Sequence, residues 1–244
     1  MHWLEFYNIA ERFQDLINPT SDEKVIKIGE KLGLNDKTSI IDFGSGCGWP
    51  LTLWAKKFGI HAIGLEFRKR SYNRALELAK QHGVEKNIEY ILGDASQYEF
   101  KPNSFDVASC MGASFIWNGF RPSLQALKKA IKPNGKILIG EPYWVTDNVP
   151  PAYAIKEKFY SELDLLRVVH EEGLDMAFMV RASADEWDRY ETANWEGLIS
   201  WIQENPDHPE RHEVVDKLHE WQDEYFRYGR QYLGWAMYIL IPKL

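Results

Sequence analysis

The chain has 244 residues, 45% of them hydrophobic and 14% aromatic, which is enough to bury one substantial core, and we expect a single domain over residues 1–244. Its formal net charge of -7 and the lack of a long basic run argue against nucleic acid as a partner. No apolar stretch approaches the roughly 20 residues that span a bilayer, and residues 1–5 lack a signal-peptide pattern, so we expect a cytoplasmic protein without membrane contact.

Strand-like and helix-like segments alternate along the first part of the chain. A capping-box spacing over residues 20–23 predicts the start of a helix that Gly33 ends. Short apolar runs, typical of buried strands, then alternate with stretches of helical periodicity. This order predicts an α/β fold with a parallel sheet covered on both faces. The expected strands are 39–43, 60–66, 88–92, 105–111 and 136–140, and the expected helices between them are 51–58, 72–82 and 122–131.

The last third of the chain breaks this alternation. We expect a helix over 152–170, a strand over 174–182 and a final strand over 232–241. Between the last two strands, two stretches of apolar residues have helical periodicity and are divided near Asn205-Pro206. They predict a helical insertion over 184–231. Four of the ten tryptophans fall in this insertion. They indicate either packing onto the sheet or a lid over a ligand.

Three glycines alternate in the loop after the first predicted strand, at Gly44, Gly46 and Gly48. A dinucleotide-binding loop has the pattern G-x-G-x-x-G, in which the third glycine lets the helix pack closely on the strand. Here the third glycine comes one residue early and Trp49 takes the dinucleotide position, which argues against NAD and FAD. The loop also lacks the Lys-Ser or Lys-Thr pair of a nucleoside-triphosphate loop. It therefore favours a cofactor without phosphates.

The motif D-x-G-x-G-x-G at residues 42–48 resembles the first motif of the class I S-adenosylmethionine-dependent methyltransferases and matches it without a departure. The resemblance implies a Rossmann-like, seven-stranded, mostly parallel sheet whose last strand is antiparallel. It also implies S-adenosylmethionine as cofactor and S-adenosylhomocysteine as product. Glycines allow close approach of the backbone to such a ligand, and the family uses the residue matching Asp42 to hold the amino end of the methionyl group.

Two further acids lie where this family contacts its cofactor. Glu66 ends the second predicted strand, and the resemblance implies that it accepts the ribose hydroxyls while Phe67 packs on adenine. Asp94 follows the third predicted strand and matches the acid for the adenine amino group, with the Ala95 amide beside it. The complete predicted cofactor set is Asp42, Gly44, Ser45, Gly46, Gly48, Glu66, Phe67, Asp94, Ala95 and Met111.

A narrower resemblance extends over most of the chain. It points to a little-characterised bacterial branch of small-molecule methyltransferases and supplies no acceptor. The stretches that carry it are 18–19, 112–116, 140–144, 187–191 and 234–235.

The acceptor side of the predicted site is less well defined. In an open α/β sheet the pocket forms beyond the carboxyl ends of the strands, which here selects residues 111–120 and 141–147. Glu141 is the candidate catalytic residue, as a polar contact to the acceptor or as a proton acceptor, and a purely structural acid is the alternative. An aromatic rim, suited to an apolar, aromatic or amine acceptor unless it serves only packing, is expected from Phe115, Trp117, Tyr143 and Trp144.

The predicted activity is methyl transfer to an O, N or C atom of a small molecule. A methyltransferase for protein or tRNA and a non-catalytic binder of S-adenosylmethionine or S-adenosylhomocysteine are the alternatives. No D/N-P-P-Y motif follows the fourth predicted strand, which disfavours adenine N6, and Cys110 is expected to be a buried packing residue. His208 and His212 have i, i+4 spacing without a third ligand, so we expect no metal site. The oligomeric state is left open.

Overall fold

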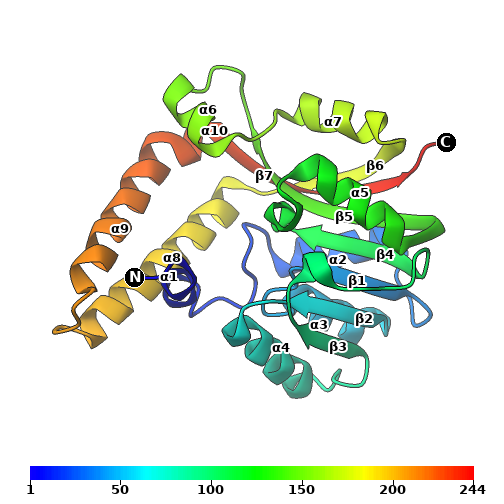
Figure 1. The fold of residues 1–244 in the computed structure, drawn as a ribbon, viewed down its shortest axis with the longest axis horizontal. Helices are drawn as coiled ribbons and strands as arrows, with labels where there is room; N and C mark the ends of the chain where they lie inside the picture. Colours follow the sequence, from blue (N-terminus) through cyan, green and yellow to red (C-terminus); the bar gives the residue numbers. More distant parts are fainter.

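The computed structural model describes residues 1–244 and has one seven-stranded sheet at its centre, with strand order β3-β2-β1-β4-β5-β7-β6 (Figure 1). β7 runs antiparallel to both of its neighbours, and the remaining pairs are parallel. The predicted Rossmann-like sheet and its antiparallel last strand are confirmed. The strands are β1 (Ser39–Phe43), β2 (His61–Glu66), β3 (Ile88–Leu92), β4 (Phe105–Met111), β5 (Ile131–Trp144), β6 (Leu174–Arg181) and β7 (Leu233–Pro242).

Helices cover both faces of the sheet (Figure 1). α2, α3 and α4 pack on one face, and α5 and α7 pack on the other. Each face buries its own apolar cluster, of 23 and 22 residues, and this two-sided burial explains why the strands read as continuous apolar runs. The helices are α2 (Asp22–Leu32), α3 (Trp49–Phe58), α4 (Lys69–Gln81), α5 (Phe120–Ala130) and α7 (Glu162–Glu171).

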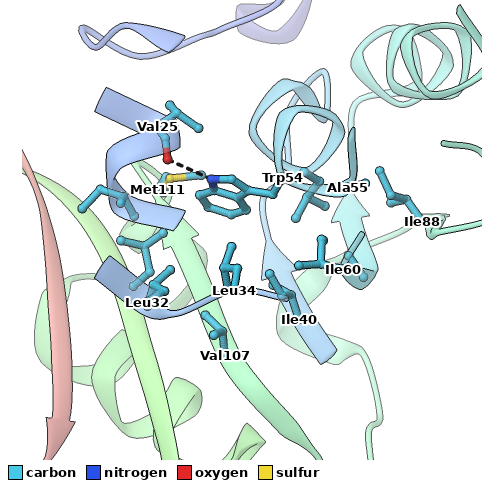
Figure 2. Packing of buried hydrophobic residues seen from close by; sticks show 14 of the residues in the cluster. Val25, Leu32, Leu34, Ile40, Trp54, Ala55, Ile60, Ile88, Val107 and Met111 are labelled. Atoms are coloured by element: carbon cyan, nitrogen blue, oxygen red, sulfur yellow. Dashed lines mark hydrogen bonds between the residues drawn. The ribbon is translucent and has the colours of Figure 1, made fainter. Parts of the chain in front are cut away.

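Trp54 anchors the first of these clusters. Its side chain is fully buried, and its indole NH donates a 2.8 Å hydrogen bond to the Val25 carbonyl, as Figure 2 shows. A buried indole NH needs such a partner, because losing its bond to water without replacement costs free energy. The bond therefore fixes α3 against α2 and holds the helix that follows the glycine loop in place.

A second group of helices projects beyond the carboxyl edge of the sheet (Figure 1). These are α1 (Trp3–Ala10), α6 (Pro151–Glu157), α8 (Ala184–Glu204) and α9 (Arg211–Glu224), the last of which continues through a π-helical turn, Tyr225–Gly229, into α10 (Arg230–Tyr232). A Cβ added to Gly197 of α8 would lie 2.3 Å from the Ala10 carbonyl oxygen, so α1 and α8 are in close backbone contact. None of the helices combines the length and hydropathy needed to cross a bilayer.

Three features differ from the expectations. α1 was not predicted, and β5 continues to Trp144 instead of ending at Gly140, because β7 pairs with it along this stretch. The expected helix over 152–170 is divided into α6 and α7. Lys158 adopts a left-handed conformation that ends α6, and the next residues bond to β5, with the Trp144 amide donating to the Tyr160 carbonyl at 2.8 Å. Strand pairing thus interrupts the helical pattern.

Candidate active site

A cavity of about 600 Å³ lies at the carboxyl edge of the sheet, between the ends of the central strands and helices α1 and α8. This volume falls within the range of small-molecule sites, roughly 300–1,000 Å³. Nine of the residues predicted from the sequence line it: Asp42, Gly44, Ser45, Gly46, Glu66, Phe67, Met111, Phe115 and Glu141.

The glycine loop needs glycine for two separate reasons. Gly44, Gly46 and Gly48 have φ angles of +77°, +56° and +69°, a region that side chains with a Cβ rarely adopt. A Cβ on Gly48 would also lie 2.1 Å from the Tyr90 hydroxyl, which donates a hydrogen bond to the Gly48 carbonyl at 3.1 Å. A Cβ on Gly46 would meet only the Ile17 side chain, in ordinary van der Waals contact at 3.5 Å. The loop is therefore packed tightly underneath and open toward the cavity.

Glu66 is held in position by the backbone of two neighbouring segments. Its side chain is 4% exposed, and its two carboxylate oxygens accept from the Gly46 amide at 2.9 Å and the Arg68 amide at 2.7 Å. A carboxylate has about four acceptor positions, so lone pairs remain for two donors in the cavity. This arrangement fits the ribose hydroxyls that the sequence motif implies.

An ion pair next to Glu66 was missed by the sequence analysis. The Arg68 guanidinium lies 3.6 Å from Glu66 and donates to the Glu11 carboxylate at 2.5 Å. Glu11 follows α1 directly, is buried and lines the cavity. Burial raises the pKa of Glu11, and Arg68 opposes this shift. The pair ties the end of α1 to the ribose end of the site, a contact between distant segments that no local motif reveals.

Asp42 is buried at the end of β1. It accepts a 2.6 Å hydrogen bond from the Ser109 hydroxyl of β4, the residue directly opposite it in the sheet. Burial raises the pKa of Asp42 to about 6, with the Ser109 bond opposing and the Glu66 charge adding to the shift. A buried carboxylate with one neutral partner favours a cationic ligand group, which fits the amino end of the predicted cofactor.

The remaining predicted cofactor contacts lie beside the cavity and not on its lining. Asp94 follows β3 and is exposed, and it accepts from the Ser96 amide at 2.8 Å and the Ser96 hydroxyl at 2.7 Å. Ala95 is buried below it, and the preceding Gly93 amide donates to the Glu66 carbonyl at 2.9 Å. Asp94 and Ala95 are thus held next to the ribose position at the same sheet edge, and their contact with adenine stays a prediction.

Glu141 has one satisfied and one unsatisfied oxygen. It lies within β5, not after it as expected, and its side chain is 7% exposed. Its Oε1 accepts from the Ser114 hydroxyl at 2.9 Å, whereas its Oε2 has no hydrogen-bond partner. Burial raises the pKa of Glu141 to about 7, and Ser114 opposes this shift. Near neutral pH such a carboxyl group can accept or donate a proton readily.

Of the four residues predicted for the aromatic rim, one lines the cavity and three lie elsewhere. Phe115 is 64% exposed and lines the cavity. Trp117 instead packs edge-on against Phe43, with 5.1 Å between the ring centroids. Tyr143 is buried in the core, and Trp144 packs against aromatic residues of α6 and the loop after it. β5 continues through Tyr143 and Trp144 and pairs there with β7, which holds these two residues away from the cavity.

Other aromatic residues take the place of the predicted rim. They come from α1, from α8, from the start of β7 and from the loop after α6, segments that are distant from one another in the sequence. The cavity-lining residues outside the predicted set include Trp3, Tyr7, Asn18, Phe159, Trp187, Tyr190, Leu233 and Trp235.

Comparisons with known proteins agree with this geometry. Residues 40–135 match a family model described as a methyltransferase domain. The chain is 34% identical to an S-adenosylmethionine-dependent methyltransferase of Geobacter sulfurreducens solved with S-adenosylhomocysteine, with a TM-score of 0.92 over 98% of both chains. A Thiobacillus denitrificans methyltransferase, also solved with S-adenosylhomocysteine, is 32% identical with a TM-score of 0.92 over 100% of both chains.

The Escherichia coli protein YjhP, described as uncharacterized, is 32% identical over 97% of this chain and 98% of its own length. The similarity to these proteins covers essentially the whole chain, including α1 and the helical insertion. The chain therefore belongs to the S-adenosylmethionine-dependent methyltransferases and uses S-adenosylmethionine as its cofactor.

Proposed function

We propose that the protein transfers the methyl group of S-adenosylmethionine to an O, N or C atom of a small molecule. The observation that carries this proposal is the unpartnered carboxylate oxygen of Glu141, which lines the same cavity as the glycine loop and Glu66. Relatives named as acting on small molecules support it. They include a glycine/sarcosine/dimethylglycine N-methyltransferase of Actinopolyspora halophila, 27% identical over 53% of this chain, and a phosphoethanolamine N-methyltransferase of Caenorhabditis elegans, 27% identical over 51%.

The residues of the sheet edge have the chemistry that the cofactor needs. When bound, S-adenosylmethionine supplies an electrophilic methyl group on a sulfonium centre. Glu66 offers acceptors to the ribose hydroxyls, and Asp42, oriented by Ser109, offers a negative charge to the amino group. The residues proposed to hold the cofactor are Asp42, Gly44, Ser45, Gly46, Gly48, Glu66, Phe67, Asp94, Ala95 and Met111.

Glu141 is the proposed proton acceptor for the incoming nucleophile. Hydroxyl, ammonium and acidic C–H groups must lose a proton before or during attack, and a base whose pKa is close to the working pH removes it most effectively. The Ser114 hydroxyl fixes one carboxylate oxygen, which leaves the other directed to the acceptor. Trp187 and Tyr190 of α8 line the cavity, and we propose that residues 184–231 serve as a lid that excludes water from the site.

Two observations weigh against the alternative functions. A non-catalytic binder has no need of an acid held in the cavity with a free oxygen and a pKa of about 7. A tRNA methyltransferase needs a basic surface, and the net charge of this chain is -7.

The proposal is tested by incubating the purified protein with methyl-labelled S-adenosylmethionine and a cell extract separated into small-molecule, protein and RNA fractions. We expect label in the small-molecule fraction only. Glu141→Gln should lower turnover on the labelled acceptor about 100-fold without changing the affinity for S-adenosylhomocysteine, and Glu89→Gln, an exposed site on β3, is the control. Label confined to protein or RNA would overturn the small-molecule proposal, and undiminished turnover would remove Glu141 from the mechanism.

A further inference from the structure

A second cavity, also of about 600 Å³, lies between α1, α6, α8 and α9. It adjoins the cofactor cavity, because the two share four wall residues: Trp3, Tyr7, Tyr190 and Leu233. We refer to it as the helical chamber. A molecule bound in the helical chamber can therefore extend past these shared residues toward the sheet edge.

The walls of the helical chamber are aromatic. Trp3 and Tyr7 of α1 meet edge to face with 6.3 Å between centroids, and Trp221 of α9 lies 5.7 Å from Tyr7. Tyr153 of α6 stacks on Tyr228 at 4.5 Å, which fixes the orientation of its ring. A chamber lined by aromatic rings favours a positively charged ligand, because the faces of such rings attract cations.

Five carboxylates line the helical chamber, and four of them have a positively charged partner. Lys156 lies 2.5 Å from Glu224 and 3.6 Å from Glu157. Lys217 pairs with Glu220 at 2.6 Å. The amino group of Met1 pairs with Glu213. Both lysines of the lining are thus already neutralised by their own acids.

Glu191 is the fifth carboxylate, and it forms no hydrogen bond or ion pair within the chain. Tyr7, Tyr153 and Tyr190 line the chamber with it, and the charge of Glu191 contributes to the raised pKa of each of these tyrosines. Burial, followed by the charge of Glu224, raises the pKa of Glu191 to about 7. An unpaired carboxylate among aromatic rings is costly to ionise, and a bound cation would remove that cost.

We propose that the helical chamber binds the methyl acceptor and that the acceptor is an amphipathic amine, whose ammonium group pairs with Glu191 among the rings of Tyr7, Tyr153 and Tyr190. The apolar body of this amine passes Leu233 and Trp3 and brings the reacting atom into the cofactor cavity near Glu141. Neutral and anionic molecules of the same shape bind less well, because they leave Glu191 unpaired. The proposal rests on the proposed function and adds the chemical class of the acceptor to it.

The test uses the purified full chain saturated with S-adenosylhomocysteine and three probes of similar shape, titrated by calorimetry. Benzyltrimethylammonium carries a permanent charge and has no lone pair to methylate. Neopentylbenzene replaces its nitrogen with carbon, and phenylacetate carries the opposite charge. We expect the cation to bind at least tenfold more tightly than either of the other probes.

Two variants locate the binding. Glu191→Gln keeps the size of the side chain and should weaken cation binding at least tenfold, while S-adenosylhomocysteine affinity and thermal stability stay as in the wild type. Glu89→Gln changes an exposed carboxylate on β3, outside the chamber, and it should leave cation binding unchanged. If Glu191→Gln proves unstable, Tyr153→Leu replaces it, with a selective loss of the cation as the expected result.

Equal cation affinity in the wild type and Glu191→Gln overturns the proposal, as does equal binding of the cation and phenylacetate, or no binding of the cation at all. The titrations are repeated on the protein without S-adenosylhomocysteine. Failure to bind S-adenosylhomocysteine with intact cation binding would then contradict the proposed function alone. Failure of cation binding with intact S-adenosylhomocysteine binding would contradict only the proposal that the helical chamber binds an amine.

Discussion

The sheet side of the molecule, which forms the cofactor cavity, and the helical side, which forms the helical chamber, offer different groups to a ligand. On the sheet side, backbone amides and strand-end carboxylates form a preorganised set, in which Glu66 is fixed by two amides and Asp42 by Ser109. On the helical side, aromatic side chains from α1, α6, α8 and α9 form the walls, and Glu191 lacks a partner. The geometry of the sheet side depends on the fold itself, whereas the helical side can change its side chains without altering the fold. A rigid sheet side is appropriate for a cofactor that all family members share, and a variable helical side is appropriate for acceptors that differ between members.

The largest effect is expected from Gly48→Ala on the sheet side. The added Cβ would lie 2.1 Å from the Tyr90 hydroxyl at a φ of +69°, so overpacking and a strained backbone together should cost about 4 kcal/mol of unfolding free energy. S-adenosylhomocysteine binding should be lost with it. Gly46→Ala, whose Cβ would make only an ordinary 3.5 Å contact with Ile17 at a φ of +56°, is the matched control and should lower the free energy of unfolding by much less in urea. Equal effects would show that the packing against Tyr90 is unimportant.

The second prediction concerns pH. Because the pKa of Glu141 is about 7 in the fold, the folded protein binds this proton more tightly than the unfolded chain does. The resulting stabilisation is complete below the ordinary pKa of a glutamate and is lost as the pH rises through about 7. Between pH 4.5 and 8, the free energy of unfolding should fall by about 3 kcal/mol less in Glu141→Gln than in wild type. Asp42 and Glu191 shift in the same direction.

Urea unfolding of the cofactor-free protein across this pH range measures the effect. The two other acids are present in both proteins, so the difference between wild type and Glu141→Gln isolates Glu141. Parallel pH profiles for the two proteins would contradict a raised pKa at this position.

A third prediction addresses the helical side. The Cβ of Gly197→Ala would lie 2.3 Å from the Ala10 carbonyl oxygen. Because the nearest atoms of α1 belong to its backbone, a change of side-chain rotamer cannot relieve this clash. α1 should therefore separate from α8, and the free energy of unfolding should fall by about 2 kcal/mol. Hydrogen exchange should increase in α1 and stay unchanged in β1 and β4. Uniform exchange across the whole chain would show that the two sides unfold as one unit and would weaken the contrast between them.

The smallest effect is expected from Ser109→Ala. This change removes the 2.6 Å hydrogen bond to Asp42, and the pKa of Asp42 should rise further from about 6. Loss of one such bond costs about 1 kcal/mol, or about fivefold in S-adenosylhomocysteine affinity at neutral pH. The loss should shrink as the pH is raised and Asp42 becomes ionised. A loss that is constant with pH would assign Ser109 a packing role instead.

The sheet side could be predicted from the sequence because its signals are local. The five strands of the first part, the glycine loop and the position of Glu66 each follow from short patterns of apolar residues and glycines. Ser109 could have been found as well, since parallel pairing of β1 and β4 places it opposite Asp42. Each cofactor contact at a strand end can thus be predicted from a short local stretch of sequence.

The helical side could not be predicted in the same way. Glu11 meets Arg68, and Trp3 and Tyr7 reach the cavity, only because α1 packs on α8, a contact between segments almost 200 residues apart in a chain of 244. Tyr143 and Trp144 were assigned to the rim because the fifth strand was expected to end at Gly140. The antiparallel pairing with β7 extends β5 through both residues, and no local pattern reveals that pairing. Long-range contacts therefore decided every residue that was misplaced.

Calorimetric titration of S-adenosylhomocysteine into wild type, Glu66→Ala and the exposed-site control Glu89→Ala tests the central claim most directly. Wild type and the control should bind one equivalent with the same affinity. Glu66→Ala should bind more weakly by about 1.5–3 kcal/mol, or about tenfold to over a hundredfold, because ribose hydroxyls lose a charged acceptor. No binding by the folded wild type, or an unchanged affinity in Glu66→Ala, would contradict the account.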